Sequence, residues 1–477
     1  MTPARPRALG LLALAGMWTA LSSGPAAAAE GICADCLQIR VGPPKVVRGP
    51  FPDELDSAFA SFLLPDGRMR GFSANSTTYA IDGQDLADMA GPRRPVLAAG
   101  EAGSRSDCGR WLTAIQQRPD ELLGFVHQER ACDYTAGRTD KSMAIAISVD
   151  DGLSWTDLGT VISGRDGPRP DAISGEGDCS LLNGEDGFYY AYCLRNADWQ
   201  TIAARARIDA PLVWHKYYEG SWDEPGLGGA ASAIGFVGTG AGFLATQGWV
   251  AAVATDPWFG GLRLSLSADK VGFVDLDEPL LSIDGSDWQR PAETDLIAYA
   301  GLLDAHSGST TIRGPLLLSY VYVPPGKGFE SRHLVQHAVT LVVGDAPVPV
   351  QVGMALTRWG DGTGYVTSTG PLTGARSDLR QDRLVAYLLT RAPQGSPSRK
   401  IAECGRGPVQ KLAVEGSCAP GFVRERTAGW LFAEVQPGTV PVYGCRTKTV
   451  ESYFAASAAD CDGLGVAEGL LGYGLTP

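Results

Sequence analysis

Two stretches of this sequence repeat one design, and the repetition constrains the fold more than any other feature. Residues 55–66 and 177–192 each carry an acid near the start, Asp56 and Asp178, and then a short apolar segment, an Asp-Gly turn and a second apolar segment. An Asp-Gly dipeptide between such segments is typical of a β-hairpin. The sequence therefore indicates a unit of paired strands that is used repeatedly, with an acid at a fixed place.

Similar units continue along the chain, and their number predicts the fold. The 61 glycines and 31 prolines suit short strands joined by turns, and long helical periodicity is absent. Five units of roughly 62 residues suit four-stranded blades with long loops. We predict an all-β protein in which residues 30–346 form a five-bladed β-propeller, with units at 38–100, 107–163, 175–214, 214–281 and 287–343.

One turn in the second unit carries a recognisable motif. Residues 148–155 read Ser-Val-Asp-Asp-Gly-Leu-Ser-Trp, in which Asp150 and Gly152 would close a tight turn and Trp155 would pack into the blade. This pattern resembles the Asp boxes of sialidases and other propellers. The resemblance implies a structural hairpin and does not identify a sugar.

A second module is predicted after the prolines Pro347 and Pro349. Its segments recur as three units of about 40 residues, a repeat length that suggests a β-trefoil-like module over residues 347–477. The first copy comprises 352–356, 365–369 and 384–390, the middle copy 409–414 and 429–434, and the last copy 442–445, 453–457 and 470–476. Such a module can bind sugar or serve only as structure.

The N-terminus has the pattern of a secretory signal peptide. Arg5 and Arg7 precede an apolar run at residues 8–21, and three alanines at 27–29 provide a cleavage site. The alternative, a membrane anchor, would need about 20 apolar residues. We expect residues 1–29 to be removed and the mature protein to be secreted, into the medium or the periplasm.

Cysteine number and charge narrow the function further. Ten cysteines in an exported chain predict five disulfides between neighbours in sequence. The expected pairs are Cys33/Cys36, Cys108/Cys132, Cys179/Cys193, Cys404/Cys418 and Cys445/Cys461. We expect no metal at Cys33 and Cys36, which lack a second pair and a nearby His.

The net charge of -13 argues against nucleic acid and anionic membranes as partners. It suits a neutral glycan, although solubility alone would explain it equally well, and we expect a monomer.

Three acids lie at or just before the first strands of units one, three and four, where a propeller strand would point them into the central funnel. They are Asp56, Asp178 and Glu224. This arrangement resembles the five-bladed propeller glycosidases, the arabinanase, furanosidase and fructan-hydrolase superfamily, which place two Asp and one Glu from different blades around the axis. The resemblance implies that Asp56 is the base or nucleophile, Asp178 a pKa modulator and Glu224 the general acid. Glycosidic cleavage needs one protonated carboxyl and one carboxylate, and a third acid raises the pKa of the donor.

Further residues are candidates for substrate binding. His127 and Glu129 alternate to one face at a strand end, and Glu129 is an alternative to Glu224 as the acid. Trp111 and Trp222 could stack on sugar rings. Arg290 could hold a carboxylate or phosphate bidentately. We expect no cofactor, and the sequence leaves open a structural cation on the propeller axis.

Two other functions stay open at this point. The first is a non-catalytic secreted propeller that binds carbohydrate or protein, and the second is a sialidase-like hydrolase. Acids that converge at the roughly 5–10 Å of two-carboxylate glycosidases would favour a secreted glycosidase acting on an extracellular polysaccharide. A funnel plugged by apolar side chains would favour binding.

Overall fold

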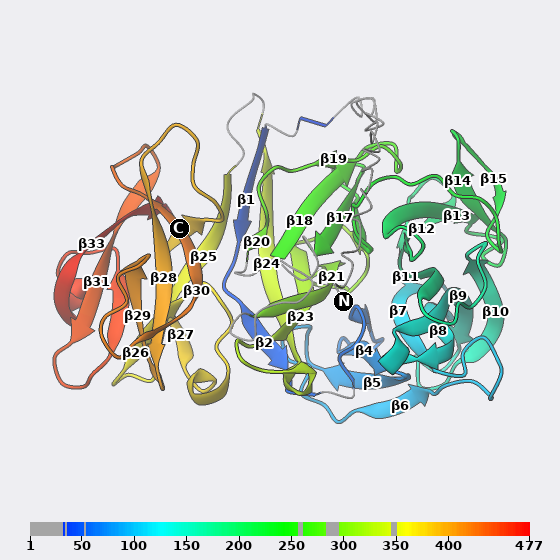
Figure 1. Cartoon of the computed structure of the whole chain (residues 1–477), viewed down its shortest axis with the longest axis horizontal. Helices are drawn as coiled ribbons and strands as arrows, with labels where there is room; N and C mark the ends of the chain where they lie inside the picture. Colours follow the sequence, from blue (N-terminus) through cyan, green and yellow to red (C-terminus); the bar gives the residue numbers. More distant parts are fainter. Residues whose placement is uncertain (1–31, 34–35, 52–53, 256–260, 283–294, 345–350) are drawn as a thin grey trace, which may run out of the picture.

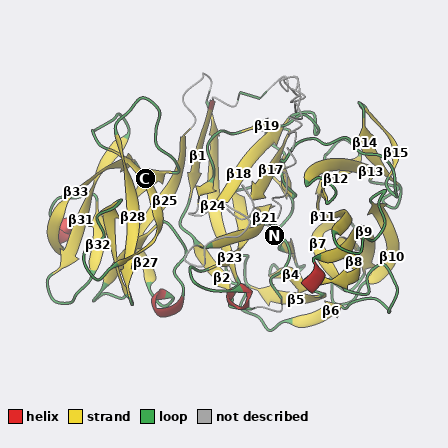
Figure 2. Ribbon diagram, in the orientation of Figure 1, coloured by secondary structure: helices red, strands yellow, loops and turns green. Residues whose placement is uncertain are grey.

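The protein is all-β, as predicted. The computed structural model describes residues 32–33, 36–51, 54–255, 261–282, 295–344 and 351–477. In these ranges the regular structure is β-strand apart from single 3-10 turns (Figure 2). The predicted signal peptide, the Pro347 and Pro349 boundary and Arg290 lie outside the described residues. No helix in the described ranges is long and apolar enough to cross a membrane.

Up to Val343, the described residues form five successive groups of strands, which we number one to five. The main strand pairings within each group are antiparallel (Figure 1). Group one is β3 (Ala60–Leu63), β4 (Met69–Asn75), β5 (Thr77–Gly83) and β6 (Arg94–Leu97). Group two is β7 (Gly109–Gln117), β8 (Leu122–Asp133), β9 (Arg138–Ser148) and β10 (Thr156–Ser163). Group three is β11 (Ile173–Asn183), β12 (Phe188–Arg195), β13 (Gln200–Arg207), β14 (Trp214–Tyr218) and β15 (Ser221–Pro225).

The remaining two groups are less regular. Group four is β16 (Gly240–Leu244), β17 (Trp249–Thr255), β18 (Gly261–Ser267), β19 (Val274–Asp275) and β20 (Leu281–Ser282), and β22 (Thr311–Ile312) pairs in parallel with β16. Group five is β21 (Leu296–Asp304), β23 (Leu316–Val323) and β24 (His333–Val343), with β1 (Leu37–Val41) and β2 (Lys45–Arg48) both paired to β24. The start of the chain therefore completes the last group, and the expectation that residues 38–100 form one unit is wrong for β1 and β2.

Apolar side chains fill the space between each group and the next. Phe62 and Phe72 of group one pack with Leu112 of group two, and similar clusters join groups two and three, three and four, and four and five. The fifth group packs on the first, where Leu303 and Leu317 meet residues of β4 and β5. Each sheet therefore buries its faces between two neighbours, which explains why the strands are rich in apolar residues on both faces.

The Asp-Gly turns form the hairpins that the sequence predicts. Gly67 links β3 to β4 and Gly187 links β11 to β12, each with the positive φ (85° and 90°) that glycine tolerates. In the turn between β9 and β10, Asp150 Oδ1 accepts hydrogen bonds from the N–H groups of Leu153 (3.1 Å) and Ser154 (2.9 Å). Trp155 then meets Phe72 edge-on, with 5.8 Å between ring centroids, and so ties this turn to group one.

The C-terminal module has three units of three strands, drawn in yellow to red in Figure 1. In each unit a long first strand pairs with a short second strand and with a long third strand. The third strands pair with one another, as in Leu389 with Trp430 and Phe432 with Tyr473. The strands are β25 (Gln351–Gly360), β26 (Tyr365–Ser368), β27 (Arg380–Leu389), β28 (Ser398–Arg406), β29 (Val409–Val414), β30 (Val423–Phe432), β31 (Thr439–Thr447), β32 (Tyr453–Ala456) and β33 (Gly465–Leu475).

The module is joined to group five by a strand and by a buried ionic network. β1 pairs in parallel with β25 while it pairs antiparallel with β24, so one sheet runs across both parts. Arg426 of β30 lies 3.3 Å from the carboxylates of Asp295 and Glu403 and donates a hydrogen bond to Tyr322 Oη (3.0 Å). Both carboxylates are almost completely buried, so the guanidinium is needed to keep these charges inside.

All five disulfides that the sequence predicts are present. Three close short loops within the strand groups or before β1, and two lie in the C-terminal module. Cys179 and Cys193 bridge the neighbouring strands β11 and β12, directly after Asp178. The described chain has no free cysteine.

Candidate active site

A cavity of about 400 Å³ collects residues from all five strand groups. Its lining draws on every group, either from a strand or from the segment just before its first strand: Asp56, Glu129, Asp178, Thr239 and Tyr299. Cavities of this size hold small molecules or parts of larger ligands. The structure thus brings Asp56, Asp178 and Glu129, all three named from the sequence, to the same cavity.

Bulges in β11 and β21 aim side chains into the cavity. The register of β11 shifts between Gly177 and Ser180, and Asp178 has a φ of 51°. The register of β21 shifts between Ala298 and Gly301, and Tyr299 has a φ of 52°. Positive φ is unfavourable for both residue types, and bulges of this kind are over-represented beside functional sites, where they redirect a side chain.

Glu129 is the most enclosed of the three acids. It lies near the end of β8, where its carboxylate accepts hydrogen bonds from Tyr134 Oη (2.6 Å), Thr139 Oγ1 (3.3 Å) and His127 Nε2 (3.1 Å). Lys141 Nζ lies 3.7 Å away. Burial acts to raise the pKa of Glu129, but these donors and the Lys141 charge outweigh it and hold the pKa at about 2. Glu129 is therefore ionised at any physiological pH.

His127 connects Glu129 to Asp178. Its Nδ1 accepts a hydrogen bond from the backbone N–H of Asp178 (3.0 Å), so the proton of the neutral ring is on Nε2, which faces Glu129. Trp111 packs edge-on against the ring at 5.4 Å between centroids. His127 and Trp111, which the sequence predicts as sugar contacts, both line the cavity. Each is almost completely buried, so they support the acids more than they provide contact surface for a sugar.

Lys141 lies between the two ionised carboxylates. Its Nζ donates to Asp178 Oδ2 at 2.7 Å as well as lying near Glu129. Burial acts to raise the pKa of Asp178. The positive charge of Lys141 and its hydrogen bond outweigh burial, so the pKa of Asp178 lies below its ordinary value. The same two acids raise the pKa of Lys141 against the effect of burial. This site therefore contains a fixed ion pair in which the ammonium serves two acids.

Asp56 is in a different electrostatic state. Burial raises the pKa of Asp56 above its ordinary value, and the negative charges of Glu129 and Asp178 add to this effect. Arg332 (3.0 Å) and a hydrogen bond from Tyr299 Oη (3.2 Å) oppose it without cancelling it. One cavity thus holds a carboxyl with a raised pKa and two with lowered pKa values, which is the pattern of an acid and base pair.

The structure does not bring Glu224 or Trp222 to the cavity. Both lie on β15, the outer edge strand of group three, because β14 pairs with β13 and so belongs to the third sheet. The carboxylate of Glu224 accepts a hydrogen bond from the N–H of Ala230 (2.8 Å), and Trp222 packs against Tyr190. The expected start of the fourth unit at residue 214 is therefore wrong, since group four begins at β16.

Five charged residues or tyrosines that line the cavity were not predicted: Tyr134, Arg138, Lys141, Tyr299 and Arg332. A signal for Lys141 exists in principle, because the β8–β9 hairpin pairs Glu129 directly with Lys141. Tyr299 and Arg332 come from group five, far away in sequence, and no local pattern marks them. Among the described residues, no group of three His, Cys, Asp or Glu side chains could hold a metal ion.

A second pocket of about 230 Å³ adjoins the cavity. The two share Lys141, Asp178 and Tyr299, so the pocket opens directly from the acids. Trp199 and Phe236 also line this pocket, and Phe236 is 36% exposed. An apolar surface beside a polar cavity suits a ligand that extends beyond one polar unit.

Comparisons with known proteins give similarity only at the level of structure. No family model and no curated protein matches the chain. A family 117 glycoside hydrolase of the marine bacterium Zobellia galactanivorans aligns with 11% identity and a TM-score of 0.45, over 64% of this chain and 91% of that one. The catalytic domain of a family 62 α-L-arabinofuranosidase of Coprinopsis cinerea aligns with 12% identity and a TM-score of 0.40, over 64% and 98% of the two chains. The β-xylosidase RS223 aligns with 12% identity and a TM-score of 0.40, over 64% and 99%. Identities and TM-scores this low assign neither a family nor an activity to the chain.

Proposed function

We propose that this protein is a secreted glycoside hydrolase that acts on an extracellular polysaccharide. In this proposal the five strand groups are the blades of a five-bladed β-propeller over residues 30–346, and residues 347–477 are an appended trefoil-like module. The observation that carries the proposal is the convergence of Asp56, Glu129 and Asp178, from three different groups, on one cavity. Two carboxyl groups in different protonation states are what glycosidic cleavage requires.

Exposure and pKa together suggest the role of each acid. The side chains of Asp56 and Asp178 are 26% and 25% exposed, whereas that of Glu129 is 9% exposed. The two open acids are therefore the ones that can reach substrate. Because the pKa of Asp56 is raised and that of Asp178 is lowered, Asp56 would donate the proton to the leaving oxygen. Asp178 would act as the base or nucleophile.

These roles differ from those that the resemblance implies. Asp56 takes the acid role that was expected of Glu224, and Asp178 takes the role expected of Asp56. Glu129 would be a positioning residue, because it anchors Lys141 and the Nε2–H of His127 and does not face the open part of the cavity. Lys141 keeps Asp178 ionised, and Tyr299 and Arg332 orient Asp56.

The test is hydrolysis of a panel of polysaccharides by the mature protein. The panel would contain arabinan, fructan, xylan and sialylated glycans, with release of reducing sugar or sialic acid as the readout. We expect one polymer to be cleaved and Asp56→Asn and Asp178→Asn each to lower kcat by about 10²–10⁴-fold. Glu224→Gln is the matched control, since its amide can still accept the Ala230 hydrogen bond, and it should keep full activity.

Three results would change the proposal. Activity that survives both Asp56→Asn and Asp178→Asn would exclude this cavity as the catalytic site. Cleavage of sialylated glycans alone would indicate a sialidase-like hydrolase. Binding of one polymer without cleavage, by protein whose circular dichroism shows a folded all-β chain, would indicate a non-catalytic binding protein.

A further inference from the structure

Arg138 is a cation of the cavity for which the described part of the chain provides no partner. It is the first residue of β9 and lines the cavity together with Glu129, Tyr134 and Thr139. Its Nε is buried and makes no hydrogen bond, and its guanidinium forms no ion pair with any residue in the described part of the chain. A buried donor that lacks an acceptor is costly, so such a group calls for an explanation.

The other two cations of the cavity behave differently. Lys141 is bound to Asp178 at 2.7 Å and lies near Glu129, and Arg332 is bound to Asp56 at 3.0 Å. Lys141 thus serves Glu129 and Asp178 and Arg332 serves Asp56, so every acid of the cavity already has a cationic partner. Arg138 is therefore not required to neutralise these acids, and its charge is available to a group that enters the cavity.

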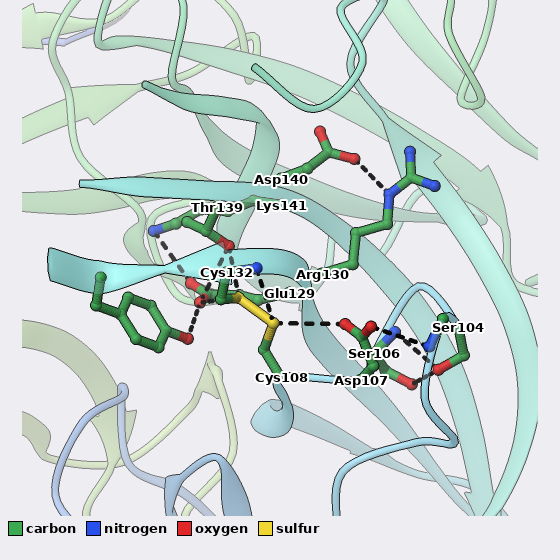
Figure 3. Close-up of a disulfide and its surroundings, with 12 residues drawn as sticks. Ser104, Ser106, Asp107, Cys108, Glu129, Arg130, Cys132, Thr139, Asp140 and Lys141 are labelled. Carbon is green, nitrogen blue, oxygen red and sulfur yellow. Dashed lines mark hydrogen bonds and ion pairs between the residues drawn. A yellow bond between two sulfur atoms is a disulfide. The ribbon is translucent and has the colours of Figure 1, made fainter. Parts of the chain in front are cut away.

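The hairpin that carries Arg138 is held in place on both sides. Asp133 Oδ1 accepts a hydrogen bond from the N–H of Ala136 (3.1 Å), and Gly137 closes the turn with a φ of 63°. The disulfide between Cys108 and Cys132 ties the end of β8 to the segment before β7 (Figure 3). Figure 3 also shows Thr139 and Lys141, the near neighbours of Arg138 in β9, directed at Glu129. A cation on so constrained a turn loses little freedom when it binds a ligand.

From this arrangement we propose that the glycan bound in the cavity carries an anionic group, a carboxylate or a sulfate ester, which pairs with the Arg138 guanidinium. The planar guanidinium has five donors and suits bidentate binding of either group. When Asp56 carries the proton that the proposed mechanism requires, the cavity holds two carboxylates, Glu129 and Asp178. Its three cations are Arg138, Lys141 and Arg332, so an anion on the substrate makes the positive and negative charges equal in number. The inference rests on the proposed function, because it names the substrate class of that same cavity.

The experiment measures binding, so that its outcome does not depend on hydrolysis. Isothermal titration of the mature protein would compare glucuronate and galacturonate with glucose and galactose, and glucose 6-sulfate with glucose. Inorganic sulfate is included to detect binding of a free anion. The variants are Arg138→Gln and Arg138→Lys, together with Arg130→Gln. Arg130 lies on the same hairpin and pairs with Asp140 at 2.7 Å, so its variant removes the same charge without changing the cavity lining.

We expect an acidic sugar to bind the wild-type protein more tightly than its neutral counterpart. Arg138→Gln should weaken that binding about 10- to 100-fold, the usual effect of losing a hydrogen bond between charged groups. Arg138→Lys should weaken it less, and Arg130→Gln should leave it unchanged. The arm that shows the effect, uronate or sugar sulfate, identifies the anionic group.

Other outcomes overturn the inference and separate it from the proposed function. Equal affinity of wild-type protein for acidic and neutral sugars would refute it, and so would equal weakening by Arg130→Gln and Arg138→Gln. If a neutral polymer is cleaved with unchanged kcat/KM in Arg138→Gln, the glycosidase proposal stands and the anionic substrate is wrong. If acidic sugars bind through Arg138 but no polymer is cleaved, the proposed anionic ligand class stands and the proposal that the protein is a hydrolase is wrong.

Discussion

Acid should weaken this fold through one buried histidine, His337. It lies on β24 in group five, where Nδ1 donates a hydrogen bond to the carbonyl of Gly42 (2.7 Å) and Nε2 accepts one from Tyr320 Oη (2.9 Å). Gly42 lies between β1 and β2, so the ring fixes the N-terminal strands to the last group. Burial lowers the pKa of His337 from 6.5 to about 4, although the Gly42 hydrogen bond acts in the opposite direction.

The sign and size of the effect follow from that pKa. Because the folded-state pKa lies below the unfolded value, the unfolded chain binds a proton first as the pH falls below about 6.5. The stability contributed by the neutral ring is therefore complete above that pH and is lost progressively towards pH 4. Between pH 8 and pH 5 the loss from His337 should be about 2 kcal/mol.

The assay is urea unfolding followed by tryptophan fluorescence, at pH 8 and at pH 5. In His337→Gln an amide replaces the ring, can still donate and accept a hydrogen bond, and does not titrate. We expect the fall in unfolding free energy between the two pH values to be about 2 kcal/mol smaller in His337→Gln than in the wild-type protein. His215→Gln, at an exposed site on β14, should match the wild type. Equal pH dependence in His337→Gln and the wild type would refute the reasoning.

Three further predictions concern stability and catalysis. Arg426→Met should lower the free energy of unfolding by about 3–5 kcal/mol, because it leaves the buried carboxylates of Asp295 and Glu403 without their cation; urea unfolding equal to that of the wild type would contradict this. Replacing Cys179 and Cys193 together by Ser should cost about 3 kcal/mol, given the 14-residue separation that the disulfide closes, and thermal unfolding with and without reductant measures it. Lys141→Met should raise the pKa of Asp178, so the acidic limb of kcat/KM should move to higher pH, and an unmoved limb would show that Asp178 is not the base.

Features of short range could be predicted from the sequence. The five disulfides join cysteines that are close in the chain, and the Asp-Gly turns at Gly67 and Gly187 form where their dipeptides predict. Asp56 and Asp178 were selected because they recur at the same place in two similar hairpins. His127 and Glu129 were selected because period-two alternation puts both on one face of a strand. The disulfides, the turns and the strand alternation depend on residues that are close in sequence, whose geometry the chain itself restricts, and the choice of Asp56 and Asp178 depends on the recurrence of one such local pattern.

Partner choice between strands was decided only by the tertiary structure. β14 and β15 follow a turn that would suit the start of a new sheet, yet they pair with β13, and this pairing removes Glu224 from the cavity. Arg332 and Tyr299 reach Asp56 from group five, more than 240 residues away for Tyr299. A strand shows in its own sequence that it is a strand, but the edge it joins depends on the apolar faces that other sheets leave open. The sequence therefore determined the all-β class, the turns and the three candidate acids, and the packing of the five groups determined which charges surround them.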